Sequence, residues 1–430
     1  MTIQRRRPFG QNYAFVVVAV VFLSLLASAG MRATPGVLML PLGAAFGWSR
    51  DSISSAAAVG ILLYGLMGPF AAALMQRFGI RRVLLVALTV MTVAAASSAL
   101  MSQPWQLVAT WGVLSGAGTG CVAVVMGATV VGRWFSTHRG LMMGLLTAST
   151  ATGTLIFLPG LAAIAEHAGW QAVVLTIAAV SAALIPLAAW LLPERPSDIG
   201  LRRYGAAADE PVDVGAPAGN LFAMTLGVLR KASRNGTFWL LFATFFVCGF
   251  TTNGLIGTHF IALCGDHGIP EVRAAGLLAM MGIFDLVGTT ASGWLTDRFD
   301  PRKLLFVYYS LRGLSLIYLP YSDFSLYSLS LFGVFYGLDW IATVPPTLRL
   351  TTDAFGERDA PVVFGWVVAG HQVGAAAAAF MAGVLRVQLG SYMTPFVIAG
   401  ATGVVAAFLA LRIGRRRDRG ELPALAGEAA

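Results

Sequence analysis

Residues 193–236 read PERPSDIGLRRYGAAADEPVDVGAPAGNLFAMTLGVLRKASRNG, the only long polar segment in an otherwise apolar chain. An apolar block of similar length lies on each side of it, and each block divides into about six membrane-length segments. A helix needs about 20 apolar residues to cross a bilayer. The pattern therefore predicts an all-α integral membrane protein with twelve transmembrane helices in two pseudo-symmetric bundles of six.

This prediction divides the chain into four parts. They are an N-terminal bundle over residues 1–192, a cytoplasmic hinge loop over 193–236, a C-terminal bundle over 237–413 and a cytoplasmic tail over 414–430. The expected spans are 13–44, 52–75, 83–101, 104–131, 140–165, 171–192, 238–263, 273–295, 303–321, 324–350, 361–385 and 391–412. The run that begins at Tyr13 is longer than the core of a signal peptide, so we expect it to be the first span.

The composition supports a membrane protein. Hydrophobic residues make up 57% of the 430 positions, charged residues only 11%, and the mean hydropathy is +0.75. Because a soluble domain carries about 25% charged residues, this chain cannot cover a water-exposed surface. The net charge of +9 comes from short basic clusters between apolar spans, which argues against nucleic-acid binding. We expect the lipid bilayer to be the main surrounding.

The chain shows no pattern typical of an enzyme or a metalloprotein. The three cysteines, Cys121, Cys248 and Cys264, have no paired spacing, so neither a metal site nor a disulfide framework is indicated. Nucleotide-binding and hydrolase motifs are also missing from the sequence. We expect no cofactor, no enzymatic activity and an energy source other than ATP.

The arginines predict the orientation. Basic residues occupy alternate connections between the expected spans, including both termini and the hinge, whereas the opposite connections hold only Arg50, Arg273 and Arg386. By the positive-inside rule, both termini lie in the cytoplasm of a multi-pass inner-membrane protein.

One loop occurs in both halves. Residues 76–82 (QRFGIRR) align with residues 297–303 (DRFDPRK), and each follows the second span of its half. Such an offset repeat is typical of duplicated transporter folds.

The second copy carries a family resemblance. Together with the preceding GWLT (residues 293–296), DRFDPRK resembles the signature loop of the major facilitator superfamily. In that family the loop locks the two halves together on the cytoplasmic side. The resemblance assigns gating roles to Arg77, Arg81, Asp297, Arg298 and Arg302. Because Gln76 replaces the aspartate in the first copy, we expect a weaker latch there.

Shorter motifs resemble one branch of the superfamily, the monocarboxylate transporters and oxalate/formate antiporters. They are FGWSR (46–50), RWF (133–135) with Arg139-Gly140, Gly169-Trp170 and RPSDIGL (195–201). The branch resemblance implies a small organic anion, most simply a monocarboxylate, moved with a proton. The superfamily resemblance implies a monomer, because the twelve-helix fold is self-sufficient in that family. The two fixed cations of a dicarboxylate carrier are not matched, because span 8 has no basic residue in its middle and span 11 carries His371 instead of a lysine. The pattern of monocarboxylate carriers is also incomplete, because Asp285 is present but Thr289 stands where they place an arginine.

Arg32 is the first candidate for substrate binding. A second apolar run, Ala33 to Phe46, follows it, so Arg32 does not mark the end of a span. Span 1 lines the central cavity in the superfamily, and a guanidinium can hold a carboxylate through a bidentate pair. The alternatives are snorkelling to the membrane interface and a structural ion pair.

Asp285, Asp339 and His371 are the candidates for proton coupling. Burial favours the neutral form of a carboxyl group, and histidine changes charge near neutral pH. We expect Arg312 to pair with one of the two aspartates and leave the other as the proton carrier, without the sequence deciding which. His371 is a candidate for either coupling or substrate binding, or else a neutral histidine bonded to a neighbouring helix. For His259 we favour a position at the membrane interface.

Neutral polar side chains complete the expected substrate site, although each can instead bond a neighbouring helix. They are Tyr64, Ser115, Thr119, Asn253 and Tyr336.

Two other functions remain open at this point. One is export of hydrophobic drug-like compounds, which the aromatic content permits. The other is a membrane sensor that binds a solute without moving it. The hinge and the tail lack a strong amphipathic pattern or a domain-sized core, which disfavours the sensor.

Overall fold

The protein folds as a bundle of long helices. We describe residues 12–206 and 221–414 of a computed structural model. Nearly all of these residues are helical, and Phe135 and Tyr204 form an isolated β-bridge. The predicted all-α class is confirmed.

The helices of the first part follow one another with short connections. They are α1 (Tyr13–Phe46), α2 (Arg50–Phe78), α3 (Ile80–Ser98), α4 (Pro104–Leu107), the π-helix η2 (Val108–Leu114), α5 (Ser115–Cys121), α6 (Val124–Trp134) and α7 (Arg139–Leu191).

The second part begins with the short 3₁₀-helix η3 and ends at α15. Its elements are η3 (Pro196–Ile199), α8 (Leu221–Ala232), α9 (Gly236–Gly249), the π-helix η4 (Phe250–Ile256), α10 (Gly257–Asp266), α11 (Glu271–Thr296), α12 (Pro301–Tyr318), η5 (Leu319–Tyr321), α13 (Leu326–Asp339), α14 (Val344–Leu389) and α15 (Met393–Ala410).

The expected spans fall on these helices. Among the described residues, ten helical stretches are long and apolar enough to cross a membrane. Spans 5 and 6 are joined within α7 at Gly169, whose φ of 80° interrupts the helix, and Gly356 with φ 76° interrupts α14 in the same way. The ten stretches do not include α12, and the count of twelve spans stays a prediction.

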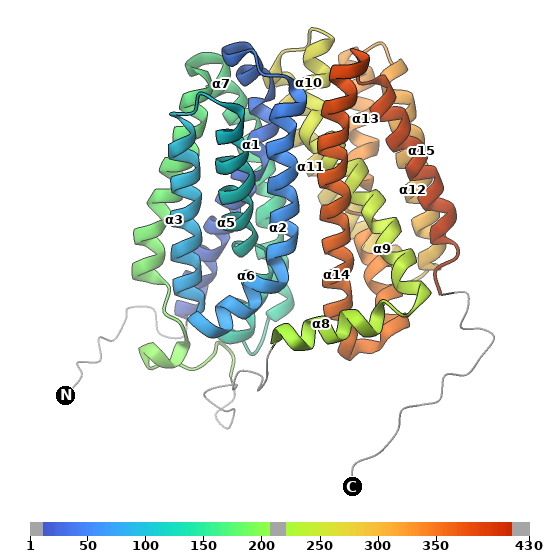
Figure 1. Cartoon of the computed structure of the whole chain (residues 1–430). Coiled ribbons are helices and arrows are strands. Elements are labelled where there is room, and N and C mark those ends of the chain that lie inside the picture. Colours follow the sequence, from blue (N-terminus) through green and yellow to red (C-terminus); the bar gives the residue numbers. More distant parts are fainter. Residues whose placement is uncertain (1–11, 207–220, 415–430) are drawn as a thin grey trace.

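The helices before and after the hinge lie on opposite sides of the molecule (Figure 1). Helix α2 of the first side lies against α14 of the second. Their backbones approach closely at Gly65, where a Cβ would overlap the side chain of Gln372. Small residues allow such close approach between membrane helices. The division into bundles of six, 1–192 and 237–413, stays a prediction.

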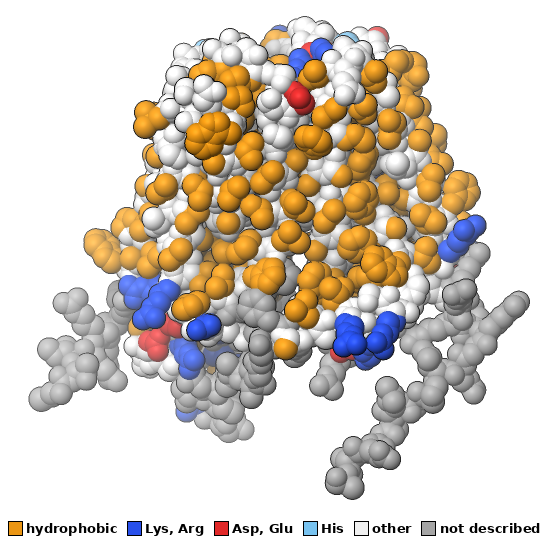
Figure 2. Space-filling model, in the orientation of Figure 1, with side chains coloured by type: hydrophobic (Ala, Val, Ile, Leu, Met, Phe, Trp, Pro, Cys, Tyr) orange, Lys and Arg blue, Asp and Glu red, His pale blue; other side chains and the backbone are white. Residues whose placement is uncertain are grey.

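The surface is divided in the way a bilayer requires. Hydrophobic side chains cover the flank of the molecule in Figure 2, whereas Lys and Arg gather at the end where the chain termini lie. Large hydrophobic side chains are exposed on the described surface, among them Leu100 at 85% and Trp190 at 76%. A belt of this kind is stable only against lipid or another apolar surface.

The hinge differs from the expected polar loop. Its second part forms α8, which lies across the end of the bundle that faces the termini (Figure 1). Lys231 pairs with Asp359 at 3.0 Å, and the indole N–H of Trp366 donates to the carbonyl of Thr225 at 3.3 Å. Residues 221–232 (LFAMTLGVLRKA) therefore form a helix within the predicted hinge, whose bounds of 193–236 stay a prediction.

Candidate functional site

A central cavity lies between the two sides of the bundle. It has a volume of about 220 Å³ and is lined by residues of α1, α2, η2, α5 and α7 from the first side. The second side contributes η4, α10, α11, α14 and the residues that follow α13. A cavity enclosed by both sides can be made accessible to either face of the membrane by a relative movement of the sides.

Arg32 is the cation of this cavity. It lies in the middle of α1, which continues without a break to Phe46, so the side chain is at membrane depth. Its guanidinium lies over the ring of Tyr64, with Cζ 4.4 Å from the ring centre. Its Nε is buried without a hydrogen-bond partner among the described residues. Arg32 is therefore held in place with a donor still available.

Asp285 is the carboxylate of the cavity and comes from α11 on the other side. The residue is 5% exposed. Its Oδ1 accepts the backbone N–H of Ile341 at 2.9 Å and the hydroxyl of Thr289 at 3.0 Å. Asp285 and Arg32 thus face one cavity from opposite sides of the bundle.

The neutral lining comes largely from places where the helices are irregular. Ser115 and Thr119 follow the π-helix η2, and Asn253 lies within η4. π-helical turns occur frequently at functional sites. Sequence reasoning missed two aromatic residues of the lining, Trp111 in η2 and Trp340 after α13. The indole nitrogen of Trp111 is buried without a partner in the described structure.

Span 10 is broken beside the cavity. Residues 340–343 form a turn instead of regular helix between α13 and α14, so backbone groups lose their helical partners. Asp285 accepts one of the freed N–H groups, from Ile341, and the hydroxyl of Ser292 donates to the carbonyl of Ala342 at 2.5 Å. Side chains of α11 therefore satisfy one flank of the break, as buried backbone groups require.

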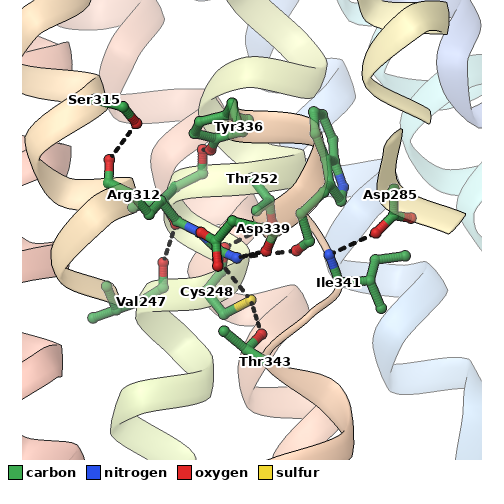
Figure 3. A network of polar contacts seen from close by, with 12 residues as sticks. Val247, Cys248, Thr252, Asp285, Arg312, Ser315, Tyr336, Asp339, Ile341 and Thr343 are labelled. Atoms are coloured by element: carbon green, nitrogen blue, oxygen red, sulfur yellow. Dashed lines mark hydrogen bonds and ion pairs between the residues drawn. The ribbon is translucent and has the colours of Figure 1, made fainter. Parts of the chain in front are cut away.

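Arg312 satisfies the other flank (Figure 3). Its Nε donates to Oδ2 of Asp339 at 2.6 Å, and its Nη2 donates to the carbonyls of Asp339 and Trp340. A third nitrogen, Nη1, lies 3.1 Å from the sulfur of Cys248. The predicted pairing of Arg312 with one aspartate is confirmed, and that aspartate is Asp339.

This ion pair gives a prediction about stability. Replacing Arg312 with methionine leaves Asp339 buried without its partner, which costs about 3–5 kcal/mol. We expect a large fall in melting temperature of the purified protein. The matched control is Arg349→Gln, which removes the exposed pair with Asp353 (58% and 52% exposed side chains) and costs at most about 1 kcal/mol. Equal melting temperatures for the two variants would contradict a structural role of Arg312.

Three predicted site residues lie outside the cavity lining. Tyr336 is buried and donates its hydroxyl to the carbonyl of Thr251 at 2.7 Å. Asp339 is held by Arg312. The ring of His371 lies 5.1 Å from that of Phe245, and its Nδ1 is buried without a described partner.

His259 faces the interior of the bundle, so its side chain does not lie against the lipid-facing surface. It is fully buried in α10. Its ring nitrogens lie 3.0 Å from the hydroxyl of Tyr392 and 2.8 Å from the carbonyl of Ala379.

The predicted gating loops lie at the end of the molecule that carries the termini. Arg77 lies over the ring of Phe78 and Arg298 over that of Trp294, with Cζ-to-centre distances of 5.3 and 4.1 Å. Asp297 is exposed, and the backbone N–H of Arg302 donates to Asp300 at 2.9 Å. Each of these contacts stays within one half of the chain.

A carboxylate nevertheless holds the first copy of the loop. Glu194 accepts the backbone N–H groups of Ile80 at 2.7 Å and Arg81 at 3.1 Å, and it pairs with Arg133. Sequence reasoning considered only position 76 and missed this acidic residue, which comes from the PERP segment after span 6.

The chain matches the profile of the Major Facilitator Superfamily over residues 20–344. It belongs to that superfamily. The predicted superfamily and the prediction of a transport protein rather than an enzyme are thereby confirmed.

The proteins that this chain is similar to include members of the expected branch, the monocarboxylate transporters. Monocarboxylate transporter 13 of Bos taurus is 27% identical over 401 residues, 92% of this chain and 88% of the relative. The uncharacterized MFS-type transporter YcxA of Bacillus subtilis (strain 168) is 27% identical over 354 residues, 80% and 82% of the two chains. The gallate transporter of Pseudomonas putida is 27% identical over 328 residues, 71% and 70%.

Solved structures of superfamily transporters share the fold. A bacterial homolog of the human lysosomal transporter Spinster, inward-facing and occupied, has a TM-score of 0.75 at 14% identity and covers 95% of this chain and 99% of its own. The nucleoside transporter NupG (D323A mutant) has a TM-score of 0.75 at 12% identity, covering 94% and 100%.

Proposed function

We propose that this major facilitator protein moves a small organic anion, most simply a monocarboxylate, together with a proton by alternating access. The observation that carries the proposal is that Arg32 and Asp285 face one cavity from opposite sides of the bundle. The first can hold a carboxylate and the second can hold a proton. The similarity to a monocarboxylate transporter and to a gallate transporter supports the substrate class.

The net charge of the cavity explains why the substrate anion and a proton would move together. Arg32 and an ionised Asp285 together carry no net charge, so binding an anion would leave one uncompensated negative charge at membrane depth. Such a charge costs several kcal/mol. Protonation of Asp285 removes it, and the loaded cavity, with Arg32 and the anion, is neutral again. The proton therefore accompanies the substrate.

The composition of the cavity lining supports the other roles that we propose. Tyr64, Ser115, Thr119 and Asn253 would surround the substrate, because they share the cavity with Arg32. Asp285 is the better proton carrier of the two aspartates, because Arg312 already neutralises Asp339. His371 and Tyr336 would act from behind the lining.

The proposed setting is the inner (plasma) membrane, with both termini in the cytoplasm. Lys and Arg gather at the end that carries the termini (Figure 2), as the positive-inside rule requires of a cytoplasmic face. Both sides of the cavity come from one chain, which supports a monomer.

Uptake into proteoliposomes tests this function. We expect labelled lactate or pyruvate to enter sealed vesicles faster with an inward proton gradient than without one. Export of hydrophobic compounds would instead give no acid flux but efflux of a lipophilic dye. A sensor would bind lactate without any flux, and either result would overturn the proposal.

A further inference from the structure

A cluster of three charges joins the two sides of the bundle at the end opposite the termini. Asp266, the last residue of α10, accepts two hydrogen bonds from the guanidinium of Arg50 at the start of α2, one of them at 2.8 Å. The same carboxylate accepts Nε of Arg386, from α14, at 2.8 Å. The side chains are only 18–24% exposed.

The aromatic ring of Tyr392 lies directly against this cluster. Both guanidinium groups lie over the ring of Tyr392, with Cζ-to-centre distances of 5.3 Å for Arg50 and 5.7 Å for Arg386. The hydroxyl of Tyr392 lies 3.0 Å from Nδ1 of the buried His259. Tyr392 thus contacts both the charged cluster and the buried His259.

A movement of the two sides away from each other would break only one of the two ion pairs of Asp266. Asp266 and Arg386 belong to helices of the same side and can stay together, whereas Arg50 belongs to the other side. Alternating access requires the sides to part at this end. Arg50 alone then loses its carboxylate partner.

The face of α2 connects Arg50 with the cavity. Ala57, Ile61 and Tyr64 line the cavity and lie seven, eleven and fourteen residues after Arg50, a spacing that places all four on one helical face. At 1.5 Å per residue, Arg50 is about 21 Å from Tyr64 along the helix. Asp51, the next residue, lies about 100° around the helix from Arg50.

We propose that Arg50 receives the carboxylate of the incoming substrate at this mouth of the cavity, and that Asp266 occupies its place while the mouth is closed. This inference rests on the proposed anion substrate. A guanidinium binds a carboxylate in a forked pair, and here the internal carboxylate has two hydrogen bonds to Arg50. The substrate and Asp266 then compete for one cation, so arrival of the anion favours the open mouth.

A matched pair of variants tests the proposal. Arg50→Gln and Arg386→Gln each remove one positively charged partner of the Asp266 carboxylate. We expect Arg50→Gln to raise the KM for lactate about tenfold or more, and Arg386→Gln to change it less than about threefold. Asp266→Asn loosens the closed state without removing Arg50, so its KM should fall. Equal increases for the two arginine variants would overturn the proposal.

A second readout does not depend on lactate being the substrate. We would place a cysteine at Ala57 and measure its labelling by anionic and cationic methanethiosulfonate reagents, relative to protein without that cysteine. Arg50→Gln should lower the ratio of anionic to cationic labelling about tenfold, and Arg386→Gln should leave it nearly unchanged. If lactate shows no flux but this ratio falls, the substrate assignment fails and Arg50 remains the anion receptor. An unchanged ratio in folded Arg50→Gln protein rejects the receptor.

Discussion

Replacing Arg32 with leucine should reduce lactate uptake by about 30-fold or more. The guanidinium lies at membrane depth over Tyr64, with its Nε still unbonded among the described residues. Loss of a charge-assisted pair to a buried carboxylate costs about 2–5 kcal/mol, and each 1.4 kcal/mol corresponds to a factor of ten. The measurement is the initial rate of labelled lactate uptake into proteoliposomes.

The control for this variant is Arg349→Leu, because Arg349 is an exposed arginine that pairs with Asp353 at the surface. We expect its uptake to stay within about twofold of the unmodified protein. Arg32→Lys keeps the charge but not the planar fork, so an intermediate rate is expected. Unchanged uptake in folded Arg32→Leu protein would exclude Arg32 as the anion anchor.

Replacing Asp285 with asparagine should abolish accumulation of lactate against its gradient. Asparagine keeps an oxygen that can accept the N–H of Ile341, so the break after α13 keeps its support. It cannot take up or release a proton, and the loaded cavity is permanently neutral. We therefore expect lactate–lactate exchange to continue while the response to an inward proton gradient disappears.

Asp353→Asn is the matched control, because it changes the same functional group on the exposed surface. Gradient-driven accumulation should be normal in that variant. If Asp285→Asn still accumulates lactate under a proton gradient, the coupling group is another residue, and Asp339 and His371 become the candidates.

The sequence predicted the fold class and much of the cavity because hydrophobicity and charge are strong signals in a membrane protein. Long apolar runs placed the spans, and Arg32 was notable because a second apolar run follows it. The cost of an isolated charge at membrane depth also predicted that Arg312 would have an acidic partner. These inferences require only the amino-acid sequence and the physical properties of the bilayer.

Features that depend on tertiary contacts were not predictable. The break at residues 340–343 is stabilised by Arg312, Asp285 and Ser292, which lie far from it in sequence or on other helices. No local signal identifies which aspartate an arginine meets across the bundle.

Helix α8, the partners of His259 and the π-helical turns were not predicted, for related reasons. Helix α8 is only 12 residues long and is held by contacts to α14, so it is too short to be recognised by a criterion based on membrane-spanning length. His259 was expected at the interface because it lies near the end of a span, yet Tyr392 and Ala379 satisfy it inside the bundle. The π-helical turns that place Trp111 and Asn253 have no recognisable sequence pattern.

The central claim is that one cavity moves a carboxylate and a proton together. The most direct test is to record labelled lactate uptake and internal pH in the same proteoliposomes, with a pH-sensitive dye trapped inside. The account predicts that lactate entry acidifies the interior, and that Asp285→Asn abolishes the acidification while exchange of lactate continues. Lactate accumulation with no change of internal pH in the unmodified protein would contradict it.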